Sequence, residues 1–475
     1  MCIGNDDSVR LRRTRQVTVA ELSKHDLKED SWIAIRGRVY DVTDFGRKHP
    51  GGEILYTASG SDATGVFNAF HPKSTWNLLK DFYVGELKDD RYDSSNLIFN
   101  ADNGSSSDWL LILGSLPWRR SQEAKEYDAD IARMRMELQR LHAFESSKLY
   151  YLWLVARNLL ILTPAIALVM GFPNNPFLLV LASILVGLFF QQCGWLCHDI
   201  CHHQLFEKRG WNNALGLLIG NLFQGFSVSW WKTKHNHHHA VPNVTETCAG
   251  GDPDIHTLPM LLWSEKLLEG EDLDRLPLFL VRNQWLFYFP LLCLARMSWL
   301  LQSIVYMSEP STVFIGGRAM KTGEITGLVL HHLLMFTLTW RIPSWALAIL
   351  FYCCAQATGG LLIGIVFTVG HNAMEVLTAD EMKMTDFVRL QLRTTRNVTP
   401  SWFSDFFTGG LNYQVEHHIW PTLPRHNLPE ASRILKALCA KHDIPYHCMG
   451  LYEGNEEVCR FIRRMSSLEE VKKRA

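Results

Sequence analysis

The segment HDICHH (198–203) follows directly on an apolar run, Phe177–Leu196, that is long enough to cross a membrane. His198 and His202 are four residues apart, so on a helix both imidazoles lie on one face, about 5–6 Å apart. Taken alone, such a pair is more typical of solvated loop histidines or hydrogen-bonded core residues than of a metal site. The segment becomes informative where other histidines meet it at the end of that membrane helix.

Two further segments repeat the spacing. HNHHH (235–239) has the i, i+3, i+4 pattern that presents three imidazoles to one site, and QVEHH (414–418) has the same pattern with glutamine first. One more histidine comes just after the last long apolar run. This set exceeds the four ligands of a structural zinc and predicts two metal ions with open positions. The predicted ligands are His198, His202, His235, His238, His239, His371, Gln414, His417 and His418.

Other polar residues in these segments are expected to play different parts. Asp199 and Glu416 are predicted to orient imidazole N–H groups rather than to bind metal. His203 and His237 are predicted to lie outside the ligand set.

Membrane crossing is predicted for four apolar runs, which form two hairpins joined by the short turns GFPNN and RIP. The third run is short and contains His331 and His332. Two other apolar stretches, 211–226 and 285–301, are predicted to be helices lying at the membrane interface. The four predicted spans are Leu149–Met170, Phe177–Leu196, Ile325–Trp340 and Trp345–Val369.

The distribution of positive charge predicts the topology. The hairpin turns carry only Arg341, whereas five basic residues precede the first span, so both chain ends and the segment 197–324 are expected in the cytosol. All the histidine segments then lie on one side of the membrane. The C-terminal KKRA (472–475) resembles a dilysine retrieval signal of the endoplasmic reticulum. The five basic residues are Arg119, Arg120, Lys125, Arg133 and Arg135.

A separate soluble unit is predicted at residues 17–88. KHPGGE (48–53) places a histidine before a proline that stiffens the turn and two glycines that let the backbone pass close to a flat ligand. A second histidine follows in FNAFHP. With GRVYDVTDF and DFYVGEL, the unit closely resembles cytochrome b5. Haem b held by two imidazoles has no open position and passes single electrons. The residues expected to hold it are the axial ligands His49 and His71, with Pro50, Gly51 and Gly52.

The haem unit bears on the identity of the other metals. Imidazole binds zinc, iron and copper, so the ligand type alone does not choose among them. Zinc cannot use the single electrons that a haem supplies, whereas iron can use them with O2 to break an unactivated C–H bond. Two iron ions are therefore expected at the histidine segments.

Composition argues against several other classes of protein. The 475 residues carry a formal net charge of -1, with a pI of about 7.0, and provide no basic field for nucleic acid. The 11 cysteines are scattered and form no pattern of a secreted disulfide framework. No cleavable signal peptide is expected in the polar first 30 residues.

Four segments, QQCGWLCHDICHHQ, WWKTKHNHHHAVPN, GDPDI and GGLNYQVEHHIWPTLPRHNL, resemble membrane front-end fatty acyl desaturases with a fused N-terminal cytochrome b5. The resemblance covers nearly the whole chain, and that family has glutamine where Gln414 stands. His371 matches a further ligand in the wider desaturase group. The implied fold is an α-helical integral membrane desaturase fold with four transmembrane helices and a cytosolic, helical, histidine-rich cap, preceded by a small α+β cytochrome b5 domain.

The resemblance also implies a division of the chain and a reaction. The parts are a haem domain (17–88), a linker and amphipathic helix (89–147), a membrane desaturase domain (148–450) and a cytosolic tail (451–475). The reaction inserts a cis double bond between the carboxyl end and an existing double bond of a polyunsaturated acyl chain, with delta-6 favoured. O2 is the expected co-substrate, and NADH-cytochrome b5 reductase the expected source of electrons.

The implied setting is the endoplasmic reticulum membrane. The expected partners are the lipid bilayer, the reductase and an acyl group carried on CoA or in a phospholipid, with no nucleic acid. The acyl chain is expected to enter a tunnel between the four spans.

Three other functions fit part of the pattern. A sphingolipid long-chain-base (delta-8) desaturase shares the cytochrome b5 fusion and the glutamine. A b5-fused lipid hydroxylase uses similar metals, but its segments usually keep histidine where Gln414 stands. A catalytically silent haem-bearing scaffold or sensor has no need of eight aligned histidines.

Overall fold

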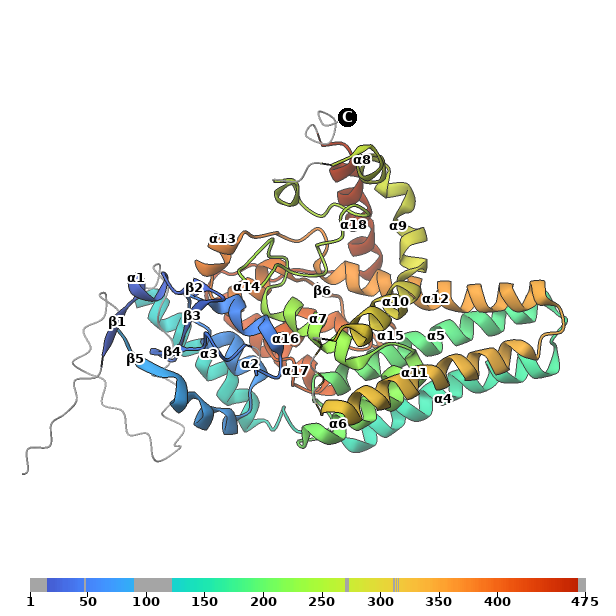
Figure 1. Cartoon of the computed structure of the whole chain (residues 1–475), viewed down its shortest axis with the longest axis horizontal. Coiled ribbons are helices and arrows are strands. Elements are labelled where there is room, and N and C mark those ends of the chain that lie inside the picture. Colours follow the sequence, from blue (N-terminus) through green and yellow to red (C-terminus); the bar gives the residue numbers. More distant parts are fainter. Residues whose placement is uncertain are drawn as a thin grey trace, which may run out of the picture.

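The computed structural model describes residues 15–46, 48–88, 122–269, 273–310, 312, 314 and 316–468. Figure 1 shows a small unit of strands and short helices beside a helical body, from which the long helices α4, α5, α11 and α12 extend together. The stretch 89–121 of the predicted linker, with Arg119 and Arg120, lies outside the described residues, as does the C-terminal KKRA sequence.

The N-terminal unit contains a five-stranded sheet in the order β1-β5-β4-β3-β2. β3 and β4 form an antiparallel hairpin, whose turn residues Arg36 and Gly37 have φ values of 54° and 71°, as a two-residue hairpin turn requires. Ile33 and Ile35 of β3 belong to one apolar core with Phe67 of α2. The elements are β1 (Gln16–Thr18), α1 (Val19–Leu22), β2 (Asp26–Leu27), β3 (Asp30–Ile35), β4 (Arg38–Asp41), the 3-10 helix η1 (Gly52–Ala58), α2 (Thr64–Phe70), the 3-10 helix η2 (Lys73–Phe82) and β5 (Tyr83–Lys88).

The long helices begin at side chains that cap them. Ser147 accepts a hydrogen bond from the Tyr150 amide at the start of α4, and Ser344 caps α12 in the same way. Asn175 accepts from the Phe177 amide at the start of α5, which opens with a proline. The Asn175 and Ser344 caps end the two hairpin turns. The helices are α4 (Lys148–Gly171), α5 (Pro176–Cys201), α11 (Gly317–Trp340) and α12 (Trp345–His371).

The prediction of four spans is supported for three of them. Among the described residues, α4, α5 and α12 are each long and apolar enough to cross a membrane. α11 is not among them, because Glu324, His331 and His332 lower the hydropathy of its apolar stretch. A further candidate is the pair α9 (Gln284–Cys293) and α10 (Ala295–Ser308), which qualifies only as one unit bent by 68°. This pair occupies the stretch predicted to lie at the interface.

The body is built from shorter helices, and its central helix α7 is anchored by α11. The Glu324 carboxylate accepts hydrogen bonds from the Ser227 hydroxyl and from the hydroxyl and amide of Ser229, the amide at 3.1 Å. A carboxylate at the N-terminus of α7 also complements the helix dipole. The body comprises α3 (Gln122–Arg140), α6 (Arg209–Gly216), the π-helix η5 (Leu217–Gln224), α7 (Val228–Ala240), η6 (Glu265–Leu268), α8 (Arg275–Arg282), α13 (Ala379–Lys383), α14 (Phe387–Thr394), β6 (Asn397–Val398), α15 (Trp402–Thr408), η7 (Leu411–Tyr413), α16 (Gln414–Ile419), η8 (Arg425–Asn427), α17 (Leu428–Lys441), β7 (Cys448–Met449) and α18 (Leu451–Ser466).

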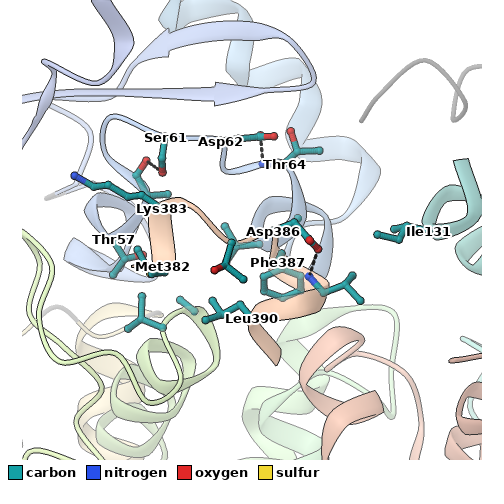
Figure 2. Close-up of a pocket in the computed structure, with 17 residues that line it drawn as sticks. Thr57, Ser61, Asp62, Thr64, Ile131, Met382, Lys383, Asp386, Phe387 and Leu390 are labelled. Atoms are coloured by element: carbon teal, nitrogen blue, oxygen red, sulfur yellow. Dashed lines mark hydrogen bonds between the residues drawn. The ribbon is translucent and has the colours of Figure 1, made fainter. Parts of the chain in front are cut away.

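The N-terminal unit is docked on this body. Lys383 of α13 forms an ion pair of 2.9 Å with Asp26, and the Arg209 guanidinium donates to the Phe70 carbonyl at 2.7 Å. A cavity of about 110 Å³ lies in this interface. Figure 2 shows the side chains of the N-terminal unit that line it, such as Thr57 and Ser61, opposite Met382, Phe387 and Leu390 of the body. The two parts therefore meet through specific side chains around a small gap.

Gly65→Ala is expected to loosen this docking without unfolding the N-terminal unit. Gly65 lies within α2, so alanine suits its local backbone. The added Cβ would lie 2.3 Å from the Cβ of Phe387 on α14, so one domain must move away. Hydrogen–deuterium exchange of α14 should rise, whereas the control Gly210→Ala, whose Cβ meets nothing within 4 Å, should leave it unchanged. Unchanged exchange of α14 in Gly65→Ala would contradict the docked arrangement.

Candidate active site

Five of the predicted ligands form one buried cluster at the C-terminal end of α5. One ring nitrogen from each of the five lies within 4.8 Å of the others. His239 Nε2 is 3.0 Å from His235 Nε2 and 3.1 Å from His417 Nε2. The cluster thus joins α5, α7 and α16, which are far apart in the sequence. Its members are His198, His202, His235, His239 and His417.

The other four predicted ligands form a second buried cluster. His238 Nε2 lies 3.3 Å from His371 Nε2 at the end of α12. The amide nitrogen of Gln414 is 3.0 Å from His371 Nε2 and 3.3 Å from His418 Nε2. A half-turn of the Gln414 amide presents its oxygen, a metal ligand, to the same point. The structure therefore places all nine predicted residues in two adjoining groups.

The chemistry of both groups fits metal ions. Burial, together with the neighbouring imidazoles, lowers the pKa of His235, His239, His417 and His418 well below the usual histidine value, so these rings are neutral. Neutral imidazole is the form that binds metal. Within the described chain, Nε2 of His198 and of His202 are buried without hydrogen-bond partners. Each buried nitrogen without a partner lowers the stability of the fold by about 1–3 kcal/mol. A bound metal ion would provide the missing partner.

Residues outside the predicted set hold the imidazoles in place. His238 Nδ1 donates to Asp252 at 2.9 Å, and His418 Nδ1 donates to the Gln391 amide oxygen at 2.9 Å. Each contact points the Nε2 lone pair of its ring at the cluster. Burial works against a charge on His238, but the Asp252 carboxylate raises its pKa above the usual value. Sequence spacing did not mark Asp252 or Gln391, because both come from separate segments.

One of the two predicted orienting carboxylates has another role. His198 Nδ1 lies 3.4 Å from Asp199, in a marginal contact. Glu416 instead accepts hydrogen bonds from the Asn397 amide and the Tyr446 hydroxyl, both at 2.7 Å. The prediction for Glu416 is wrong because a residue between Gln414 and His417 points to the opposite face of α16. Its carboxylate ties α16 to β6 and the chain near α17.

The two adjacent histidines lie outside both clusters. His203 has a positive φ of 61°, and its ring faces Lys232 at 3.2 Å. His237 contacts the Gly250 carbonyl at 3.3 Å.

The N-terminal unit places the Nε2 atoms of its two predicted axial ligands toward each other. His49 Nε2 lies 3.5 Å from His71 Nε2. Their Nδ1 atoms donate to the carbonyls of Gly52 and Phe67, which directs the Nε2 lone pairs at each other. Burial lowers the pKa of both rings, that of His71 to about 4. A Cβ on Gly51 would lie 3.0 Å from the His49 ring, so this glycine is needed at the ligand. The residues fit a haem bound from both sides.

An apolar cavity of about 210 Å³ adjoins the histidine clusters. His235, His238 and His371 form one part of its wall, and the ion pair between Lys234 and Asp254, at 3.2 Å, lies at its polar margin. α7, α9, α10, α12 and the segment 254–263 enclose it, so it differs from the expected tunnel between the four spans. The apolar wall is formed by Trp230, Trp231, Ile255, Leu261, Trp263, Leu292, Ala295, Trp299, Ile363 and Phe367.

Comparison with known proteins identifies the family. The family model described as fatty acid desaturase matches residues 174–450, more than half of the chain. The chain belongs to the fatty acid desaturases. A second family model, cytochrome b5-like Heme/Steroid binding domain, matches residues 18–88. The desaturase is thus fused to a haem-binding cytochrome b5 domain, and it is an oxidoreductase of the front-end type.

Several curated relatives are similar over most of their length. The acyl-lipid (9-3)-desaturase of Physcomitrium patens is 35% identical over 94% of this chain and 78% of its own. The delta(8)-fatty-acid desaturase of Euglena gracilis is 33% identical over 90% and 94%, respectively. The delta(6)-fatty-acid desaturase fat-3 of Caenorhabditis elegans is 31% identical over 86% and 90%. Because these names give different double-bond positions, the likeness alone does not choose one.

Asp252→Asn is expected to weaken metal binding while leaving the haem domain intact. The neutral amide no longer holds the His238 N–H as the carboxylate does, and loss of such a contact typically lowers metal affinity about 10–100-fold. Iron content measured after dialysis against a chelator should fall, with an unchanged haem absorbance spectrum. Glu416→Gln is the matched control, since the Glu416 carboxylate is hydrogen-bonded to Asn397 and Tyr446, and this variant should retain its iron. Equal iron loss in both variants would contradict this division of roles.

Proposed function

We propose that this desaturase inserts a cis double bond between the carboxyl end and an existing double bond of a polyunsaturated acyl chain, with delta-6 favoured. The observation that carries the proposal is the apolar cavity that ends on both histidine clusters. The residues around the first two histidine segments most resemble those of delta-6 desaturases, which supports delta-6. The alternative is a sphingolipid long-chain base in the same cavity, because that desaturase class shares the domain fusion and Gln414.

The proposed ligand set is the nine residues of the two clusters, with His49 and His71 for haem. When bound, two iron ions and the haem supply one-electron chemistry with O2. In the overall reaction, O2, two electrons and two protons remove two hydrogens from adjacent methylenes and give an alkene and two waters. The chain itself positions the substrate. Trp230, Trp299 and Phe367 exclude water from the acyl chain, and the Lys234–Asp254 margin faces its carboxyl end.

The proposed location is the endoplasmic reticulum membrane, with the haem domain and the C-terminal part in the cytosol. The N-terminal unit, the body with both histidine clusters, and α18 all lie at one end of the long helices (Figure 1). This common end supports the topology derived from charge, in which a cytosolic NADH-cytochrome b5 reductase supplies electrons to the haem domain. The acyl carrier is proposed to be CoA or a phospholipid, presented from the bilayer.

One side chain lies between the haem domain and the first histidine cluster. The Phe70 ring centroid is 6.0 Å from that of His239, in an edge-on contact at 88°. Phe70 directly precedes the haem ligand His71 in the chain. The docked arrangement therefore supports transfer of electrons from the haem domain through a short bonded and packed route.

Phe70→Leu is expected to slow the delivery of electrons without changing their uptake. Leucine keeps the apolar contact but removes the ring that reaches His239. Stopped-flow absorbance should show slower reoxidation of reduced haem in the presence of substrate and O2, whereas reduction by the reductase should keep its wild-type rate. Equal slowing of both phases would indicate damage to the haem domain and would reject the proposed route.

The reaction is tested by expression in a yeast host fed C18 and C20 polyunsaturated acids. Product double bonds are located by mass spectrometry, and His418→Ala is the inactive control because it removes a proposed ligand. A new double bond six carbons from the carboxyl end is expected. A new double bond at another position would reject delta-6, and product formed only from sphingoid bases would establish the alternative. Normal product from His418→Ala would contradict the two-metal site.

A further inference from the structure

A buried lysine of the desaturase body faces the haem-binding loop. Lys232 lies on α7, and only 9% of it is exposed to solvent. Its ammonium group donates to the Asn213 amide oxygen at 3.1 Å and contacts His203 Nε2 at 3.2 Å. A lysine ammonium has three N–H donors, so one remains beyond these two contacts.

A small cavity between the two domains receives this group. It has a volume of about 30 Å³ and is lined by Pro50 and Gly51 from the haem domain and by Asn213, Lys232 and Thr233 from the body. A volume of that order accommodates one or two small polar groups. The third N–H donor of Lys232 is thus adjacent to the loop that carries the haem ligand His49.

Lys232 forms no ion pair with an Asp or Glu among the described residues, although the carboxylate of Glu324 favours its charge from a distance. In the ranges that the structure describes, no Asp or Glu oxygen lies within 4.0 Å of its nitrogen. The buried carboxylate of Glu324 is engaged by Ser227 and Ser229. Burial lowers the pKa of Lys232, which reflects the cost of holding a cation away from water. A site of this kind is suited to an anion from elsewhere.

A second cation reaches the haem domain beside its other ligand. The Arg209 guanidinium donates to the carbonyl of Phe70, next to His71. The two histidines mark the opposite faces of the haem site, and α6 and α7 contact the chain beside each of them. Two cations of the body thus lie beside the chain segments that carry the two haem ligands, Arg209 beside His71 and Lys232 beside His49.

Haem carries two propionate carboxylates at one edge of its ring. We propose that Lys232 binds a haem propionate of the docked domain, with Arg209 as the neighbouring cation. The cofactor thereby forms part of the interface between the domains, and Lys232 acts as a positioning residue for electron delivery. This inference rests on the proposed haem-binding function of the N-terminal unit and is independent of the acyl substrate.

The test is a double-mutant cycle between the lysine and the propionates. Full-length wild type and Lys232→Met are each loaded with haem or with haem dimethyl ester, whose propionates are uncharged. Docking is measured by hydrogen–deuterium exchange of α14, which packs on the haem domain. Lys232→Met should raise this exchange about tenfold, the scale of losing one desolvated charge pair. The ester should raise it similarly in wild type and add nothing in Lys232→Met.

Controls separate this contact from general damage. Lys232→Arg should retain docking, and Arg209→Gln, a change at an exposed residue, should show the same coupling to the ester in weaker form. Lys383→Met breaks the ion pair with Asp26 in the same interface, so its effect should be equal with haem and with the ester. The haem spectrum and iron content of each variant verify that both sites are intact.

Two results would overturn the proposal. The first is additive loosening by Lys232→Met and the ester, and the second is unchanged exchange in Lys232→Met. Neither substrate nor turnover is needed, so a lack of product in the yeast test would reject the desaturation proposal and leave this one standing. Failure of the protein to hold haem between His49 and His71 would reject both the haem assignment and this inference.

Discussion

The structure depends on keeping eight imidazoles buried and close together. Ring nitrogens only 3.0–3.3 Å apart repel one another when protonated, and burial adds to that cost. The chain meets this constraint by fixing four elements at one point: the C-terminal ends of α5, α7 and α12, together with α16. The carboxylate of Glu324 anchors α7, and the Glu416 carboxylate anchors α16. Metal binding would turn an unfavourable cluster of lone pairs into a stabilising one.

The same point in the fold joins the membrane helices to the haem domain. α5 and α12 bring their terminal histidines out of the apolar bundle, and the cavity along α7 and α10 brings an apolar path to these histidines. The docked N-terminal unit closes the other side, where Phe70 approaches His239. The apolar cavity and the docked N-terminal unit thus adjoin the clusters on different sides, so that the apolar path is separate from the polar domain interface.

Much of this site could be predicted from sequence because most of its histidines follow local helical spacing. The i, i+3, i+4 patterns at 235–239 and 414–418 predicted six of the nine clustered residues, including Gln414. The i, i+4 pair in HDICHH predicted His198 and His202, the family resemblance predicted His371, and the apolar runs predicted three of the candidate membrane spans. Asp252 and Gln391 could not be found in this way, because their contacts with His238 and His418 join segments that have no common spacing. The role of Glu416 was misjudged because proximity in sequence to two histidines does not determine which face of α16 it occupies.

In the membrane part, hydropathy alone does not predict the roles of α11 and of the α9–α10 pair. α11 is of spanning length, yet it carries the polar residues Glu324 and His331 in place of apolar ones. Glu324 contacts the start of α7, and His331 contacts η5. The bent pair α9–α10 is apolar along its length, and Leu292, Ala295 and Trp299 of this pair help to enclose the cavity. Both features arise from packing between distant segments, which a single helix pattern does not encode.

The central claim is that the two histidine clusters form one two-metal iron site. Iron analysis combined with Mössbauer spectroscopy of the purified, iron-57-loaded protein measures this directly. The account predicts two non-haem irons per chain, in addition to the haem iron, present as a magnetically interacting pair. A single non-haem iron, or zinc in place of iron at full activity, would contradict it.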